Sequence, residues 1–99
     1  MGRFLFALLI TATVHASEPS LERQKVLRNM LKHDCGACHG LTRKGGLGPS
    51  LLPEALADKS DALLVQTIQD GRKGTPMPPW KMFITAKETQ WLIEEFFRQ

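Results

Sequence analysis

The sequence predicts an all-α domain. Three stretches carry apolar residues at helical spacing, each preceded by a residue that caps helix N-termini, and no stretch alternates apolar and polar residues as a strand would. Segments rich in glycine and proline separate the three stretches. We therefore expect three to four helices joined by irregular loops.

The first 16 residues are predicted to be a signal peptide. Arg3 precedes an apolar run over residues 4–14, and Val14-His15-Ala16 is a small-residue cleavage site. The run is too short to span a bilayer. An N-terminal core helix is the alternative, but the run lacks helical periodicity. We expect cleavage after Ala16, which leaves residues 17–99 as one periplasmic domain with no stable membrane insertion.

Each predicted helix has recognisable start and stop signals. Ser20 caps a helix over residues 21–34, Ser60 begins a shorter helix that Gly71 ends, and Thr85 with Glu88 forms a capping box. Residues 40–53 and 71–79 are expected to be loops. The apolar faces consist of Val26, Leu27, Met30 and Leu31 in the first helix, Leu63, Leu64 and Ile68 in the second, and Leu92, Ile93, Phe96 and Phe97 in the third.

The segment Cys35-Gly36-Ala37-Cys38-His39 predicts one covalently bound haem c. Cysteines three positions apart on one helical turn point the same way, which suits thioether bonds to two neighbouring vinyl groups. His39 follows at once, so these tethers hold its imidazole beneath the iron as the proximal ligand. A redox dithiol lacks its usual strand-helix-strand setting, and a zinc site would find a further ligand only in His33. A haem would also enlarge the core of so small a domain.

Met77 is our prediction for the sixth position of the iron. It lies in the segment 74–80, where flanking prolines restrict the backbone and present the thioether at low entropic cost. Met30 belongs to the apolar face of the first helix. Met82, His33 as a weaker rival, and an open position remain alternatives.

The order of these motifs resembles that of a small class I cytochrome c. The residues within the motifs most resemble those of cytochrome c55X. The haem-binding segment is followed by Gly48-Pro49-Ser50-Leu51, a Met-Pro segment and an amphipathic helix. The resemblance implies helices packed around the haem, with crossing N- and C-terminal helices. It also gives the Pro49 carbonyl a hydrogen bond from the proximal histidine. The first helix departs from the class in lacking a small-plus-aromatic pair at the crossing.

The resemblance to cytochrome c55X implies electron donation to the dissimilatory haem-cd nitrite reductase of denitrification, or a part in making its d-type haem. With His39 and Met77 on the iron, no site remains for a substrate, so the residues favour an electron carrier over an enzyme. A catalytic haem would require that Met77 leave the iron. Partners would be the reductase and an upstream electron donor. The formal charge of +3 includes Arg3 of the predicted signal peptide; the +2 that remains is roughly cancelled by two haem propionates, so nucleic acid is not an expected partner.

An exposed haem edge is expected to be the route for electrons. Small or flat residues, namely Gly36, Ala37, Pro78 and Pro79, are predicted to frame it. Basic side chains elsewhere would steer an acidic partner to that edge, or simply form an ordinary solvated surface. They are Arg43, Lys44, Arg72, Lys73, Lys81 and Lys87.

Overall fold

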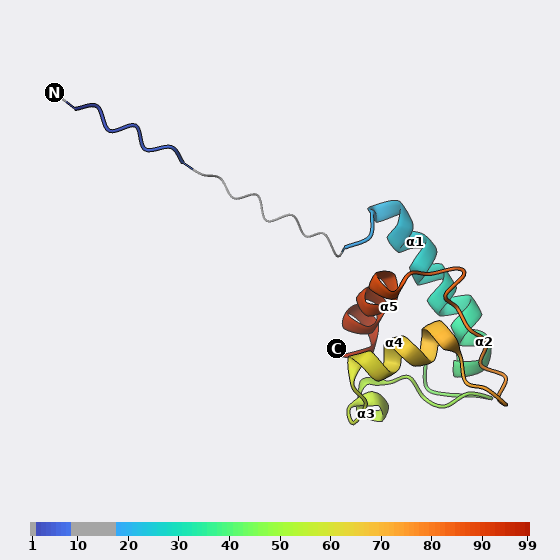
Figure 1. Cartoon of the computed structure of the whole chain (residues 1–99). Coiled ribbons are helices and arrows are strands. Elements are labelled where there is room, and N and C mark those ends of the chain that lie inside the picture. The colour runs from blue at the N-terminus through green and yellow to red at the C-terminus, as the bar shows by residue number, and fades with distance from the viewer. Residues whose placement is uncertain (1, 9–17) are drawn as a thin grey trace.

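The computed structural model describes residues 2–8 and 18–99, and within them every regular element is helical (Figure 1). Residues 2–8, at the start of the predicted signal peptide, form no regular structure, and Phe4 is 90% exposed. The rest of that peptide, with the predicted cleavage site after Ala16, lies outside the described residues. No helix in the described ranges has the length and apolar character needed to cross a membrane.

One continuous helical run carries the predicted haem-binding segment. It consists of α1 (Leu21–Met30), a π-helical turn η1 (Leu31–Cys35) and α2 (Gly36–His39). The Ser20 hydroxyl caps its start by accepting a hydrogen bond from the Arg23 N–H at 3.2 Å. The run extends past the predicted end at Asp34, because Gly40 is the first residue to leave the right-handed region, with a φ of 89°.

The two later predicted helices begin at their predicted caps. The Ser60 hydroxyl accepts from the Leu63 N–H at the start of α4 (Asp61–Asp70), and Gly71 ends that helix with a φ of 69°. Thr85 and Glu88 form both hydrogen bonds of the capping box that begins α5 (Ala86–Leu92). A π-helical turn η2 (Ile93–Phe97) continues α5. A short helix α3 (Pro53–Leu56), which was not predicted, begins at the last residue of the predicted loop over residues 40–53.

The N- and C-terminal helices pack against each other, as Figure 1 shows for α1 and α5. Arg23 bonds to Glu88 at 2.5 Å, and the Arg28 guanidinium carbon lies 5.7 Å from the centre of the Trp91 ring. Long side chains make both of these contacts, in keeping with the missing small-plus-aromatic pair. The buried core comprises Leu27, Leu31, Leu56, Leu64, Ile84, Trp91, Leu92, Ile93 and Phe97.

Candidate haem site

A cavity of about 620 Å³ lies between α2, α4 and the two loops rich in glycine and proline. Its size falls in the range of cofactor pockets. The four predicted iron and thioether residues, Cys35, Cys38, His39 and Met77, all line it. Most of the remaining wall is apolar, with Leu51, Leu56, Leu64, Ile68, Trp80 and Phe97 among its residues.

The two cysteines carry free, half-buried thiols. Burial, reinforced by the negative charge of Asp34, raises the pKa of the Cys35 thiol to about 11. A catalytic dithiol needs a lowered pKa, so this environment does not suit the redox alternative. The zinc alternative also lacks support, because no three His, Cys, Asp or Glu side chains gather as a metal site within residues 2–8 and 18–99.

His39 is buried and oriented by a hydrogen bond. Its Nδ1 lies 2.7 Å from the carbonyl oxygen of Pro49. A carbonyl can only accept, so Nδ1 carries the proton and Nε2 keeps the lone pair that a metal requires. The same hydrogen bond fixes the orientation of the ring.

The loop that supplies Pro49 is folded onto the end of α2. The last carbonyls of a helix have no partner within the helix. Here the Gly45 N–H donates to the carbonyl of His39 at 2.9 Å, and the Gly48 N–H donates to that of Cys38 at 2.8 Å. Satisfying these carbonyls brings the loop back beneath the helix, so the Pro49 carbonyl reaches the His39 ring.

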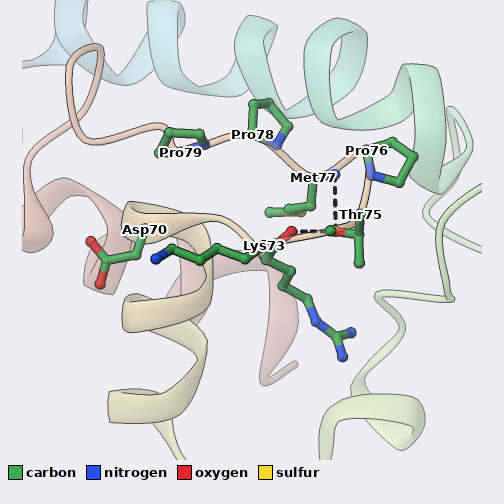
Figure 2. A pocket seen from close by; sticks show the side chains of 9 residues that line it. Asp70, Lys73, Thr75, Pro76, Met77, Pro78 and Pro79 are labelled. Carbon is green, nitrogen blue, oxygen red and sulfur yellow. Dashed lines mark hydrogen bonds between the residues drawn. The ribbon is translucent and has the colours of Figure 1, made fainter.

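The loop that supplies Met77 is held by its own hydrogen bonds. The Arg72 N–H donates to the Met77 carbonyl at 3.2 Å, which closes the loop. The Thr75 hydroxyl donates to the Arg72 carbonyl at 2.6 Å and accepts from the Met77 N–H at 3.3 Å; Figure 2 shows both bonds. With proline on either side of Met77, the backbone has little freedom to move the thioether.

The Met77 loop is also anchored to the end of a helix. The Trp80 N–H donates to the Ile68 carbonyl at 3.1 Å, and the Lys81 N–H donates to the Gln69 carbonyl at 3.2 Å. These are carbonyls of the last turn of α4, where partners within the helix run out. Both loops are therefore fixed by a helix C-terminus: the Pro49 loop by the end of α2 and the Met77 loop by the end of α4.

The alternatives for the sixth position lie away from this cavity. Met82 is 88% exposed, His33 is exposed, and Met30 packs against the core. None of the three lines the cavity. Among the methionines of the described residues, Met77 alone has its side chain at the site.

One prediction about the surface is wrong, and a second residue is less exposed than expected. Gly36, which was expected at the exposed haem edge, is buried because Leu41 folds back over it after the helix ends. A Cβ on Gly36 would touch Leu41. Arg43, expected to be a steering cation, is half-buried with its guanidinium carbon 5.5 Å from the centre of the Phe96 ring. Ala37 is exposed as predicted.

Some cavity-lining residues were not predicted from the sequence. Lys59 is the clearest case: it lines the cavity from the corner between α3 and α4, and no motif surrounds it. Its approach depends on tertiary packing, which a local pattern does not reveal.

The residues present fit a covalently attached haem. Two thiols one helical turn apart, an imidazole with a free Nε2 and a thioether share one largely apolar cavity. Such a cavity matches the apolar ring of the cofactor.

Comparison with known proteins points the same way. The protein-family model described as cytochrome C oxidase, cbb3-type, subunit III matches residues 22–94. Cytochrome c55X of Pseudomonas aeruginosa is 49% identical over 76 residues, which are 77% of this chain and 64% of that relative's length. Cytochrome c55X of Stutzerimonas stutzeri is 40% identical over 94 residues, covering 95% of this chain and 83% of the relative.

Solved structures show the same likeness. A structure described as c-type cytochrome NirC superimposes with a TM-score of 0.74 and 50% identity, covering 77% of this chain and 89% of that one. Part of the dihydro-heme d1 dehydrogenase NirN, solved in complex with DHE, superimposes with a TM-score of 0.62 and 32% identity. That match covers 73% of this chain and 15% of the dehydrogenase.

Proposed function

Because the chain belongs to the cytochrome c55X family of c-type cytochromes and carries covalent haem c, we propose that it is a periplasmic electron carrier. In this proposal it receives electrons from an upstream donor and passes them to the dissimilatory haem-cd nitrite reductase. The haem supplies a one-electron iron couple. The chain supplies the attachment, the axial ligands and the surface on which a partner docks.

The observation that carries this proposal is the cavity that His39 and Met77 share. In the proposed site, Cys35 and Cys38 would form the thioethers, and His39 Nε2 and the Met77 thioether would bind the iron. A thioether ligand raises the reduction potential, and two axial protein ligands leave no position for a substrate. The protein is therefore proposed to be an electron carrier and not an enzyme.

The route for electrons is proposed to be the edge of the cofactor beside the Met77 loop. Ala37, Pro78 and Pro79 are exposed, so a partner can approach closely there. Arg72 and Lys73 are exposed on the same loop and would attract an acidic partner surface. Long-range attraction of this kind raises the association rate and weakens with added salt.

Stopped-flow mixing of the reduced protein with oxidised nitrite reductase tests the proposal. We expect rapid oxidation whose rate falls as salt increases. Lys73→Glu should slow the reaction at low salt and converge on the wild-type rate at high salt. Lys25→Glu, which makes the same charge change on an exposed residue of α1, is the matched control. Slow oxidation at every salt concentration would exclude the donor role.

A second candidate function is a part in making or delivering the d-type haem of the reductase. The observation that favours it is the likeness to part of dihydro-heme d1 dehydrogenase, at 39% identity over 70 residues. Equilibrium titration of the purified holoprotein with free d-type haem tests a carrier role of this kind. Binding at micromolar or lower concentration would support it, and the absence of any spectral change would exclude it.

A further inference from the structure

The cavity has to accommodate carboxylates as well as an apolar ring, because a haem carries two propionates. The charged residues that line it are Asp34, Lys59 and Arg72. A carboxylate inside an apolar site is costly unless a cation or a hydrogen-bond donor meets it. The position of each lining cation relative to the propionates is therefore informative.

The cysteines determine where the propionates lie. In a haem, the two vinyl groups and the two propionates occupy opposite edges of the ring, so a ring tethered through Cys35 and Cys38 turns its carboxylates away from α2. Asp34 lines the cavity on the cysteine side, where its negative charge would repel carboxylates. In Figure 1, α2 and α3 lie well apart at the two ends of the loop that joins them.

Lys59 belongs to the corner that precedes α4, and Figure 1 shows that the start of α4 is the end of that helix away from α2, which carries Cys38. Lys59 stands between α3 and α4, three residues after the buried Leu56 and two before the first residue of α4. Arg72, in contrast, follows the C-terminal end of α4 and closes the Met77 loop. Of the two lining cations, Lys59 is the one at the propionate end.

The backbone beneath Lys59 is fixed by Arg98 from the C-terminus. The guanidinium of Arg98 donates to the carbonyls of Lys59 and Leu56 and also to the carboxylate of Asp61. Holding this corner in place reduces the entropy lost when the lysine binds a ligand. The Lys59 ammonium has only a weak partner. Its nitrogen lies 3.5 Å from a carboxylate oxygen of Asp58, and the side chains of Lys59 and Asp58 are 44% and 81% exposed.

We propose that the Lys59 ammonium binds a haem propionate and exchanges its exposed contact with Asp58 for that carboxylate. This inference rests on the haem and the cysteine tethers, but not on the identity of the redox partner. A neutralised propionate stabilises the oxidised iron less than a free one does, so the ion pair raises the reduction potential.

Two measurements on the purified holoprotein test the proposal without any partner. Lys59→Gln should lower the reduction potential and shift a propionate carboxylate band in the redox-difference infrared spectrum of haem labelled with ¹³C in its carboxylates. Lys59→Arg keeps the charge and should largely restore the wild-type potential. Lys87→Gln, which removes a lysine charge from the exposed start of α5, is the matched control and should leave the labelled band in place.

The result that overturns the proposal is equally specific. It fails if Lys59→Gln leaves the labelled band unmoved, or if its potential changes no more than that of Lys87→Gln. It also fails if Arg72→Gln moves the labelled band and Lys59→Gln does not. Since neither measurement includes the reductase, these outcomes are distinguishable from a failure of the proposed electron donation.

Discussion

Gly48 lies against the imidazole ring of His39 so closely that a Cβ on the glycine would stand 2.8 Å from Cε1 and 2.9 Å from Nδ1. The same ring makes its hydrogen bond with the neighbouring Pro49. The glycine therefore lets the loop approach the ring face while the proline carbonyl holds the ring edge. A side chain at position 48 would have to displace the loop or the ring.

Gly48→Ala is expected to weaken the binding of His39 to the iron and to destabilise the fold by about 1–3 kcal/mol, as overpacking does. The measurements are the Soret and near-infrared spectra of the holoprotein and its unfolding in urea. Gly36→Ala is the control, because its Cβ would meet Leu41 at an ordinary 3.5 Å. Equal, small effects of the two substitutions would show that the approach of Gly48 is unimportant.

Gly71 offers a paired test at the other loop. Gly71 and Gly74 both have positive φ, at 69° and 75°. A Cβ on Gly71 would lie 2.7 Å from the Met77 carbonyl oxygen, whereas one on Gly74 would meet nothing within 4 Å. Gly74→Ala should therefore cost only the left-handed backbone, about 1 kcal/mol.

Gly71→Ala should in addition push the Met77 segment away from α4. We expect it to diminish the near-infrared absorption that arises from sulfur-to-iron ligation and to lower the reduction potential, because the thioether is less well presented. Both variants are measured by spectroscopy and by redox titration. If the two alanine variants behave identically, backbone strain, and not the contact with Met77, is the reason why position 71 is a glycine.

The features that could be predicted from the sequence are those with short-range causes. The caps at Ser20, Ser60 and Thr85 each bond to an N–H three residues ahead, so the local sequence contains both partners. The cysteine spacing is equally local. The hydrogen bond between His39 and Pro49 was expected only from the family resemblance, because it joins residues ten positions apart.

The features that could not be predicted depend on tertiary packing. Helix α3 is a single turn that begins at Pro53 and is stabilised by the burial of Leu56 in the core, and such a turn has no periodicity to detect. The burial of Gly36 depends on the path of the chain after Gly40. Lys59 reaches the cavity only because its corner is held by the C-terminus.

The pairing of Arg23 with Glu88 makes the stability of the fold dependent on acid pH. The hydrogen bond from Arg23 is the main reason why the pKa of the Glu88 carboxyl is lowered. A carboxyl with a lowered folded-state pKa contributes stability above its unfolded value of about 4.3, and that contribution is lost as the pH falls through the folded-state pKa. The α1–α5 contact therefore weakens in acid.

Glu88→Gln should reduce the free energy of unfolding at pH 7 by about 1 kcal/mol, a modest value because Arg23 is one-third exposed and solvent screens the pair. The variant and the wild type should converge as the pH falls through the lowered folded-state pKa of Glu88. Urea unfolding of the oxidised protein between pH 3 and 7 measures this. Glu95→Gln, an exposed carboxylate further along the same helical run, should leave the pH dependence unchanged. If the free energy of unfolding of Glu88→Gln runs parallel to that of the wild type across this pH range, the Arg23–Glu88 pair is not the cause of the pH dependence.

Met77→Ala tests the sixth ligand directly. The Met77 thioether lies at the haem cavity, whereas Met82 is 88% exposed and away from it. Loss of the thioether should abolish the weak sulfur-to-iron absorption in the near infrared and lower the reduction potential, since a methionine ligand raises it. The freed position would also bind added imidazole or cyanide, which ultraviolet–visible titration detects.

Met82→Ala should keep the near-infrared absorption and bind these ligands no better than the wild type. Survival of that absorption in Met77→Ala would mean that another side chain ligates the iron.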